Sequence, residues 1–451
     1  MKIRDYQIAG SDFIVEHGGR ALLADEAGSG KTLQALHAIM GLKGQPVLIF
    51  TINPGLFVWQ DELEHWFQEK AIVYTGNKKD RALLHQKFIK DDYRYLIANY
   101  FFIEELSELF KLGYWKTIVT DEYHIMGISN HRTARYKALF PIAKKADNLI
   151  MVTGSPMRRN LADLFAPFKM IDPPNFKSYW RYVNTHCVVT EDFFGKTIEA
   201  MQRNPVEFTK MRKNYMLRRL KKDILPELPP KTRQVISVFM TSEQKKIYDM
   251  MDKDMVIDYK GIFITAPNPA VKMIRLRQLL VTPMILGFDV IGGALQHLAE
   301  LISSEFEEGN PVAVFTPFKT NAIKPIKKYL LSKLSKTEIF HLHGAMPFKQ
   351  IKENVQGFQN LPTERKVFLG VIKSGMAITL TAAKVCIFLG YEWTSEENDQ
   401  AENRLHRYGQ TDNVRCLYIL HRDNPVDERV MEILNTKQYN INWALKTEDF
   451  I

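Results

Sequence analysis

Short apolar runs, separated by longer amphipathic stretches, are the feature of this 451-residue chain that most restricts its fold. Such runs, bounded by turn residues, are typical of buried parallel strands that alternate with helices. Five runs lie in the first third of the chain: RALLA (20 to 24), VLIFT (47 to 51), YLIANY (95 to 100), TIVTDE (117 to 122) and NLIMVTG (148 to 154). Five more lie in the last third: VAVFTPF (312 to 318), IFHLHG (339 to 344), KVFLGVI (366 to 372), VCIFLG (385 to 390) and VRCLYIL (414 to 420). The pattern predicts two α/β domains.

The middle of the chain has a different pattern. From about 166 to 290 the apolar runs lapse, and charged helical stretches such as VEFTKMRKNYMLRRLKKDIL (206 to 225) replace them. The prolines of LPELPPK (225 to 231) suit a rigid connector. We therefore expect a first domain over 1–165, a basic helical insertion and linker over 166–290, a second domain over 291–423, and a final helix over 424–451 that packs back on the body.

Composition narrows the class of protein. Hydrophobic residues make up 45% and charged residues 25% of the chain, and no apolar run reaches the length that crosses a bilayer. The N-terminus, MKIRDYQIAG, is too polar for a secretory signal, so we expect a cytoplasmic protein without a membrane partner. Cys187, Cys386 and Cys416 are far apart and odd in number, and no CxxC or Cys/His ligand spacing surrounds them, so the sequence suggests neither a disulfide framework nor a zinc site. His341 and His343 suit strand positions rather than metal ligands.

Net charge suggests a polyanionic partner. The chain carries a formal charge of +10, and ten basic residues face three acids between 201 and 233. We therefore expect that most of the net charge sits in this one short segment.

LLADEAGSGKT (22 to 32) is a candidate phosphate-binding loop, because it follows an apolar run and opens a helical stretch. Gly28 and Gly30 let the backbone approach phosphates, Lys31 reaches the outer phosphates, and Thr32 can ligate magnesium. Asp25 stands where the usual pattern GxxxxGK[ST] has its first glycine. The alternative is a glycine turn before an amphipathic helix. The context favours binding of ATP with Mg²⁺.

Two further stretches carry candidate catalytic residues. Asp121 and Glu122 end an apolar run, and phosphoryl transfer needs one carboxylate to hold magnesium and one group to position the attacking water. We assign Asp121 to the metal and Glu122 to the water. In QAENRLHRYGQ (400 to 410), read as a helix, Gln400, Arg404 and Arg407 share one face, and the two arginines can neutralise charge that develops on a phosphoryl group.

These motifs together resemble the Swi/Snf-type DNA translocases of helicase superfamily two. The resemblance covers nearly the whole chain: RDYQ (4 to 7), ADEAGSGKT (24 to 32), NPGLFVWQDELEHW (53 to 66), DEYH (121 to 124), TGSPMRRNLADL (153 to 164), YMLRRLKKDILPELPPK (215 to 231), MTSEQKKIYD (240 to 249), IRLRQLL (274 to 280), ITLTAA (378 to 383) and QAENRLHRYGQ (400 to 410). LRRLKKDILPELPPK is more specific to this family than the phosphate-binding loop is. Ala27, Ser29 and VIKSGMAITLT (371 to 380) depart from the family pattern.

The resemblance implies a fold and several residue roles. It implies two RecA-like parallel-sheet domains with a helical insertion and a C-terminal bracing helix. Gln7, with Arg4 nearby, resembles the family's adenine-recognition element. The nucleotide-binding set is Arg4, Gln7, Ala27, Gly28, Ser29, Gly30, Lys31, Thr32 and Gln400. His124, Thr153 and Ser155 resemble the elements that relay nucleotide state to the DNA.

Within the family, Thr379 in ITLTAA and Glu402 in QAENRLHR are more similar to the fork-remodelling, strand-annealing branch than to nucleosome remodelers. The compact chain is similar to bacteriophage or bacterial branch-migration helicases, which implies a bacterial or phage-infected host cell. The resemblance thus implies an ATP-dependent motor that translocates on duplex DNA and remodels or unwinds forks and Holliday junctions. No obligatory protein partner is visible in the sequence.

Candidate DNA contacts lie where predicted strands end, because a motor that follows a strand grips phosphates through loop groups there. These residues are Asn53, Gly55, Asn99, Lys319, Thr320, Lys373 and Ser374. Two alternatives to a DNA motor stay open, an RNA helicase and a non-hydrolysing DNA-binding protein with a decayed ATPase fold.

Overall fold

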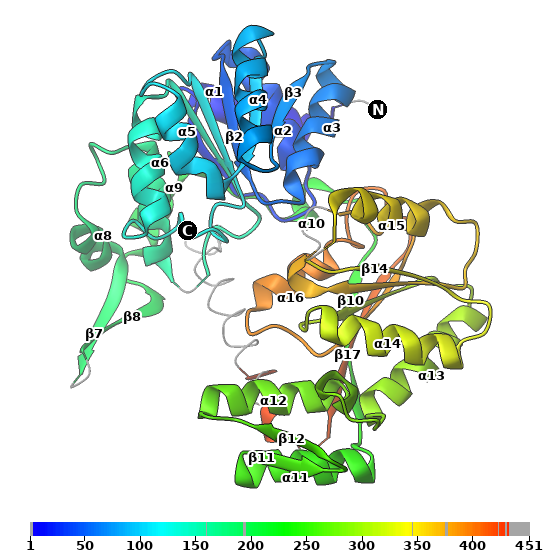
Figure 1. Cartoon of the computed structure of the whole chain (residues 1–451). Coiled ribbons are helices and arrows are strands. Elements are labelled where there is room, and N and C mark those ends of the chain that lie inside the picture. The colour runs from blue at the N-terminus through cyan, green and yellow to red at the C-terminus, as the bar shows by residue number, and fades with distance from the viewer. Residues whose placement is uncertain are drawn as a thin grey trace. The chain divides into compact units, whose positions relative to one another are not determined.

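The computed structural model describes residues 3–158, 160–192, 195–344, 346–374, 378–422, 424–428 and 431–432. The side chains of residues 192, 200–202, 320, 348 and 374 lie outside the description. The described residues divide into two units, one up to residue 226 and one from residue 227 onward (Figure 1). Most of the helix predicted over 424–451 lies outside the described residues.

The first unit is built on a seven-stranded sheet in the order β3-β4-β2-β5-β6-β1-β9, and every neighbouring pair is parallel. Its strands are β1 (Arg20–Leu23), β2 (Val47–Thr51), β3 (Ala71–Tyr74), β4 (Tyr95–Asn99), β5 (Thr117–Asp121), β6 (Asn148–Val152) and β9 (Met216–Leu217). The five apolar runs predicted as strands in the first third of the chain are therefore confirmed.

Helices cover both faces of this sheet. The helices of the unit are α1 (Asp5–Glu16), α2 (Lys31–Leu42), α3 (Gly55–Phe67), α4 (Lys78–Lys90), α5 (Ile103–Leu109), α6 (Ala134–Lys145), α7 (Phe165–Ile171), α8 (Tyr179–His186), α9 (Pro205–Lys213) and α10 (Lys221–Ile224), with 3-10 turns η1 (Tyr100–Phe102) and η2 (Leu161–Leu164). Side chains of α1, α2 and α3 pack on one face of the sheet, and side chains of α4 to α7 pack on the other.

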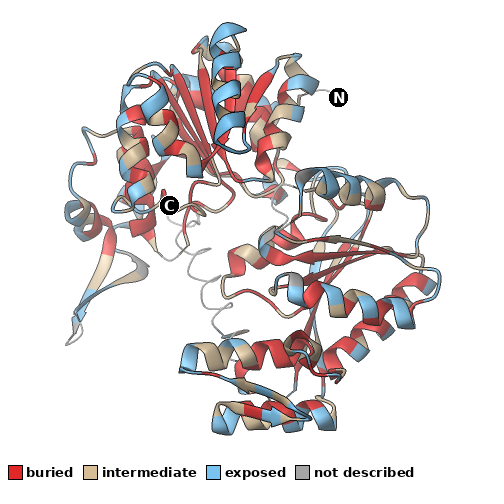
Figure 2. Cartoon of the chain, in the orientation of Figure 1, coloured by how far each residue is buried: buried red, intermediate tan, exposed pale blue. Residues whose placement is uncertain are grey.

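The alternation of side chains along each strand explains this layering. In β2, Leu48 and Phe50 belong to one core cluster, whereas Val47 and Ile49 belong to the cluster on the opposite face, and all four are buried. The central strands of this sheet are coloured as buried in Figure 2. Each such side chain stabilises the fold by about 1.5–3 kcal/mol on burial. A strand that is buried on both faces must be apolar throughout, which is why the runs were readable in the sequence.

The second unit contains a six-stranded parallel sheet in the order β10-β17-β16-β13-β15-β14. Its strands are β10 (Lys231–Val238), β13 (Val312–Thr316), β14 (Glu338–Leu342), β15 (Lys366–Val371), β16 (Val385–Leu389) and β17 (Val414–His421). Its helices are α11 (Ser242–Asp254), α12 (Pro269–Val281), α13 (Gly293–Glu307), α14 (Thr320–Lys333), α15 (Phe348–Asn360) and α16 (Ser395–Glu402), with 3-10 turns η3 (Pro283–Leu286) and η4 (Ile372–Ser374). Both sheets have the RecA-like architecture that was expected.

Helices also cover the second sheet on both faces. Side chains of α13 and α14 pack on one face, and side chains of α15 and α16 pack on the other. A separate small core joins α11 and α12 with the hairpin of β11 (Val256–Tyr259) and β12 (Ile262–Thr265). Within the described part of the chain, no helix has the length and apolar character needed to span a membrane.

The segment from 166 to 290 is less helical than its sequence suggested. It contains two antiparallel hairpins, β7 (Cys187–Asp192) with β8 (Gly195–Gln202) and β11 with β12, as well as strands β9 and β10. The stretch from 206 to 225, read as one helix, is interrupted where β9 pairs in parallel with β1. Backbone pairing with a distant strand overrides local helix propensity there.

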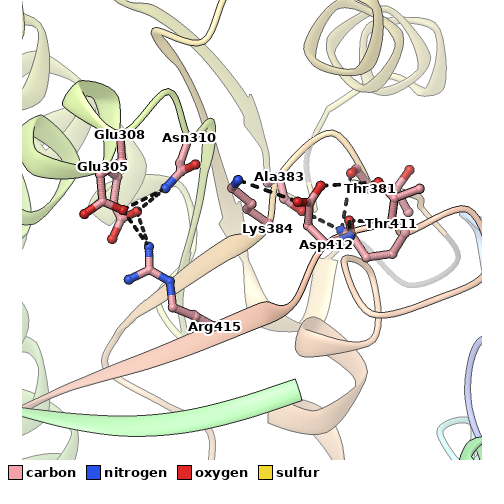
Figure 3. A network of polar contacts seen from close by, with 10 residues as sticks. Glu305, Glu308, Asn310, Thr381, Ala383, Lys384, Thr411, Asp412 and Arg415 are labelled. Atoms are coloured by element: carbon pink, nitrogen blue, oxygen red, sulfur yellow. Dashed lines mark hydrogen bonds and ion pairs between the residues drawn. The ribbon is translucent and has the colours of Figure 1, made fainter. Parts of the chain in front are cut away.

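Ion pairs at the amino edge of the second sheet link the segments that enter its strands. Arg415, at the start of β17, lies 2.5 Å from Glu305 and 3.4 Å from Glu308, and Asn310 donates to both carboxylates (Figure 3). Lys384 and Asp412, which precede β16 and β17, lie 3.7 Å apart. Arg415 and Lys384 at this edge are therefore paired with nearby acids.

Candidate functional site

The predicted phosphate-binding loop connects β1 to α2. Gly28 has φ 88° and Gly30 has φ 71°, a left-handed conformation that favours glycine. A Cβ atom on Gly30 would lie 2.4 Å from Nε2 of Gln7, so the predicted adenine-recognition residue lies directly against the loop. Gln7 is held in place because the backbone N–H of Arg4 donates to its Oε1 atom at 3.1 Å.

Lys31 and its neighbours have the chemistry of a phosphate site. Lys31 is buried, and its ammonium group donates to the carbonyl oxygens of Asp25 (2.8 Å) and Glu26 (3.0 Å). Burial lowers the pKa of Lys31, and the carboxylates of Glu122, Asp25 and Asp121 oppose that shift. The Ser29 hydroxyl is buried without a hydrogen-bond partner among the described residues. These groups, with Thr32 in the first turn of α2, fit a bound polyphosphate.

Asp25, the residue that departs from the usual loop pattern, forms a buried ion pair with Arg219. Its Oδ1 atom accepts from the backbone N–H (3.0 Å) and Nε (3.1 Å) of Arg219, and its Oδ2 atom accepts from Nη2 (2.5 Å). Arg219 also donates to the carbonyl of Tyr6 (2.9 Å) and to Gln34 Oε1 (3.0 Å). One guanidinium therefore connects α1, the loop and α2.

The segment around Arg219 also lies along the loop through its backbone. The N–H groups of Leu22, Ala24 and Glu26 donate to the carbonyls of Tyr215, Leu217 and Arg219, which continues the β1–β9 pairing into the loop. Arg218 donates to the carbonyls of Ala24 (2.7 Å) and Gly154 (3.0 Å). Sequence reasoning missed Arg218 and Arg219 as part of this site, because no local pattern relates them to a loop almost two hundred positions earlier.

Asp121 ends β5, and two hydrogen bonds hold its carboxylate in place. Its Oδ2 atom accepts from Thr51 Oγ1 at 2.9 Å and from Trp59 Nε1 at 2.8 Å. Burial and the neighbouring Glu122 raise the pKa of Asp121 to about 6, although these two hydrogen bonds act in the opposite direction. Mg²⁺ is usually bound by one or two protein oxygens together with substrate phosphates, and the predicted pair of Thr32 and Asp121 fits that pattern. The described residues include no group of three or more His, Cys, Asp or Glu that would hold a metal.

Glu122 lies in a connected polar chain with the predicted coupling residues. It adopts φ 48°, which is uncommon for a residue other than glycine and often marks functional sites. Thr153 Oγ1 donates to Glu122 Oε2 (3.1 Å) and lies 2.9 Å from His124 Nδ1. The backbone N–H of Ser155 donates to the same hydroxyl at 2.9 Å. The structure thus brings together His124, Thr153 and Ser155 beside the carboxylate that we assigned to water positioning.

The three predicted DNA contacts of the first unit lie at the carboxyl ends of β2 and β4. Asn99 Nδ2 donates to Asn53 Oδ1 at 2.6 Å, so these two side chains form a pair. Gly55 is the first residue of α3, and a Cβ atom there would lie 2.1 Å from Thr51 Oγ1. Because Thr51 donates to Asp121, a larger residue at 55 would disturb the carboxylate as well.

The predicted arginines of the second unit are not on a helix. Helix α16 ends at Glu402, so it contains Gln400, but Arg404 and Arg407 lie in the turn that follows. The reading of 400 to 410 as one helix with a shared face is wrong, because the backbone leaves the helix after Glu402. Arg404 is buried, and its Nη2 atom donates to the Ile372 carbonyl at 2.5 Å. Its Nε and Nη1 atoms have no hydrogen-bond partner in the described part of the chain, and burial lowers the pKa of Arg404 to about 9.

The remaining predicted residues differ in their surroundings. Arg407 is half-buried and donates weakly to Ile378 at 3.4 Å. Lys319 is exposed immediately before α14, and Thr320 begins that helix. Lys373 pairs with Glu392 (3.0 Å) and Glu397 (3.5 Å), which reduces its positive charge for a ligand. Ser374 lies in η4, and its side chain, like that of Thr320, is outside the description.

The contacts of Glu402 were also not anticipated from the sequence. Its buried carboxylate accepts from Lys231 (2.6 Å), Arg233 (2.7 and 2.8 Å) and Tyr418 (2.7 Å). Burial acts to raise the pKa of Glu402, but Lys231 and Arg233 outweigh burial and hold it at about 2. The carboxylate thereby joins α16 to the edge strand β10, immediately before the turn that carries the two arginines.

Known proteins that are similar to this chain are longer than it is, and the similarity covers only part of their length. It is 27% identical over 448 residues to the human "DNA annealing helicase and endonuclease ZRANB3", an alignment that covers 97% of this chain and 40% of that protein. It is 25% identical over 464 residues to "SWI/SNF-related matrix-associated actin-dependent regulator of chromatin subfamily A member 1" of Mus musculus, covering 95% and 42%. The chain thus spans about two fifths of the length of these relatives.

A solved structure, "Sulfolobus solfataricus SWI2/SNF2 ATPase core in complex with dsDNA", is similar with a TM-score of 0.45 and 24% identity, covering 100% of this chain and 94% of that chain. Two family models match successive parts of the sequence. The helicase conserved C-terminal domain matches residues 293–409. The SNF2-related domain matches residues 6–285, which is more than half of the chain, and the chain therefore belongs to the SNF2-related family.

Proposed function

We propose that this chain is an ATP-hydrolysing motor that translocates on duplex DNA. The observation that carries the proposal is the arrangement of the phosphate-binding loop, Asp121 and Glu122 at one edge of the first sheet. The charges of Asp121 and Glu122 both act to raise the pKa of Lys31, and Glu122 accepts a hydrogen bond from the Thr153 hydroxyl. Membership of the SNF2-related family supports this function, as does the basic charge of the chain.

The residues divide into binding and chemical roles. Lys31, with the backbone N–H groups of residues 27 to 30, binds the phosphates of ATP, while Arg4, Gln7 and Gln400 contact the rest of the nucleotide. Thr32 and Asp121 hold Mg²⁺, which supplies charge neutralisation at the phosphates. Glu122 orients the attacking water, and Arg404 and Arg407 neutralise the charge that develops on the transferred phosphoryl group.

Coupling to DNA follows from the contacts of Glu122. The Glu122 carboxylate accepts a hydrogen bond from the Thr153 hydroxyl, which also contacts His124 and accepts from the backbone N–H of Ser155, and these contacts support a coupling role. A change at the phosphates would therefore reach the loop of residues 153 to 156, and the DNA groups at strand ends would respond. Alternating grip by the two units would then advance the motor along one strand.

The more specific part of the proposal is that the substrate is branched DNA, at replication forks or Holliday junctions. The support is the similarity to a DNA annealing helicase over 97% of this chain, together with Thr379 and Glu402 in the motifs that we compared above. Other relatives are chromatin factors, so branched DNA is the part of the proposal that most needs a test. The bacterial or phage setting and the domain limits 1–165, 166–290, 291–423 and 424–451 also stay predictions.

The decisive experiment is steady-state ATP hydrolysis without nucleic acid and with single-stranded DNA, linear duplex, a forked junction or RNA. Stimulation by duplex, and more strongly by the fork, supports the proposal. Stimulation by RNA alone would identify an RNA helicase instead. Hydrolysis that is absent in every condition would favour a non-hydrolysing DNA-binding protein.

A further inference from the structure

Two buried side chains outside the nucleotide-binding set lie against the carboxylate of Asp121. Thr51 is the last residue of β2, and Asp121 is the last residue of the neighbouring parallel strand β5, so both lie at the same edge of the first sheet. Trp59 lies one turn into α3, the helix that follows β2, and its side chain is fully buried. A strand end and a helix therefore meet at this one carboxylate.

Both donors bind the same oxygen of Asp121. Oγ1 of Thr51 donates to Oδ2 at 2.9 Å, and Nε1 of Trp59 donates to Oδ2 at 2.8 Å. The hydroxyl of Tyr100 also donates to the backbone carbonyl of Asp121 at 2.7 Å, which holds the main chain. Within the described part of the chain, Oδ1 of Asp121 accepts no hydrogen bond. The second oxygen is therefore the one that is left for a ligand.

Packing fixes the direction of these two donors. The indole of Trp59 is part of the core on the face of the sheet that α1, α2 and α3 cover, and its only polar group is the N–H that Asp121 accepts. Gly55 leaves the space that Thr51 needs, because a Cβ atom on Gly55 would lie 2.1 Å from Thr51 Oγ1. Neither donor can turn away from the carboxylate without disturbing its neighbours.

The number of free oxygens on a carboxylate affects which divalent cation it suits. Ca²⁺ is large, accepts many oxygen ligands in flexible geometry, and binds carboxylates through one oxygen or both. Mg²⁺ is smaller, demands nearly ideal octahedral geometry, and uses only one or two carboxylates beside the phosphates of its substrate. A carboxylate with one oxygen occupied by two donors offers a single oxygen, which suits Mg²⁺ better than Ca²⁺.

We propose that Trp59 and Thr51 are positioning residues that restrict Asp121 to metal binding through Oδ1 alone and thereby favour Mg²⁺ over Ca²⁺ at the nucleotide site. Both residues act through Asp121 and not on the metal itself. The inference rests on the proposed function, because it concerns the carboxylate that we assign to Mg²⁺.

The test uses two variants of the full chain that each remove one donor, Trp59→Phe and Thr51→Val. Trp66→Phe is the first control, because Trp66 lies on the same helix and its Nε1 atom also donates to a carboxylate at 2.8 Å, that of Glu62. Trp115→Phe is the second control, because it removes a buried indole elsewhere in the first unit. Thermal unfolding establishes that each variant is folded.

The measurement is binding of a fluorescent ATP analogue during titration with Mg²⁺ or with Ca²⁺, and again in EDTA. Removal of a group that holds a metal ligand typically lowers metal affinity by about 10–100-fold. The Mg²⁺ concentration for half-maximal binding should therefore rise by at least about 10-fold in Trp59→Phe and in Thr51→Val. The Ca²⁺ concentration should change much less, and the affinity in EDTA should stay unchanged. Both controls should keep the values of the unmodified protein.

Two results would overturn the inference while leaving the motor proposal intact. One is an unchanged Mg²⁺ requirement in both folded donor variants. The other is equal weakening with Mg²⁺ and Ca²⁺, or equal weakening in Trp59→Phe and Trp115→Phe, because a general loss of packing would produce either result. If neither nucleotide binding nor hydrolysis by the unmodified chain responds to Mg²⁺, then the proposed function fails as well.

Discussion

Replacement of Arg219 by glutamine should weaken ATP binding strongly, although Arg219 belongs to no nucleotide-binding motif. The side chain of Asp25 is fully buried, and its three hydrogen bonds all come from Arg219. Arg219→Gln removes the guanidinium and leaves a buried carboxylate without its countercharge. Breaking a buried pair in this way costs about 3–5 kcal/mol.

Loss of this pair destabilises the native conformation of the phosphate-binding loop, because Arg219 joins the loop to α1 and α2. When only a fraction of molecules holds a binding-competent loop, the apparent Kd rises by the inverse of that fraction. About 3–5 kcal/mol corresponds to roughly two to three and a half powers of ten. We expect the Kd and KM for ATP to rise by at least about 100-fold, with a much smaller change in kcat at saturating ATP.

The assay is titration with a fluorescent ATP analogue, combined with hydrolysis kinetics and thermal unfolding. Arg203→Gln is the matched control, because Arg203 is exposed and its guanidinium donates to the Asn184 carbonyl rather than to the phosphate-binding loop. Adding Asp25→Asn to Arg219→Gln removes the uncompensated charge, so the double variant should bind ATP more tightly than Arg219→Gln alone. An unchanged Kd in Arg219→Gln, or a double variant no better than the single one, would refute this reasoning.

Three other predictions concern charged groups. Lys31→Ala and Arg407→Ala should each abolish DNA-stimulated ATP hydrolysis while DNA binding stays measurable, and full turnover in either variant would contradict the assignment. Because the pKa of Asp121 is raised to about 6, magnesium-dependent nucleotide binding should weaken as pH falls through 6, and Asp121→Asn should remove that pH dependence. The pKa of Glu402 is depressed from its usual value of 4.5 to about 2. The charged carboxylate therefore stabilises the fold fully at pH values above 4.5, and this stabilisation is lost as the pH falls toward 2. Glu402→Gln should therefore destabilise β10 by about 3 kcal/mol at pH 7, as measured by hydrogen exchange at residues 231 to 238, and equal protection in both proteins would disprove it.

The sequence predicted the central strands of both sheets because each is apolar over its whole length. β9 and β10 were not predicted, each for a different reason. β9 has only two residues, and β10 is an edge strand with Lys231, Thr232, Arg233 and Gln234 in succession. An edge strand is half solvated, so its composition does not distinguish it from a loop.

The candidate site was predictable to the extent that its groups are local in sequence. Lys31 and Thr32 follow their glycines directly, and Asp121 and Glu122 end a strand, so spacing alone indicated their chemistry. Arg404 and Arg407 were placed on a helix because their spacing is helical, yet the helix stops at Glu402. Spacing cannot report the point at which tertiary contacts end a helix.

By itself, the sequence determined two α/β domains, the phosphate-binding loop and the pair of acidic residues, because hydrophobic periodicity and loop chemistry depend on neighbours along the chain. Only the tertiary structure decided what each charge does. Arg219 is bound to Asp25, whereas Lys324 is exposed. The physical reason is that the effect of a charge depends on burial and on partners within a few ångströms, and folding brings those partners from positions that no sequence spacing reveals.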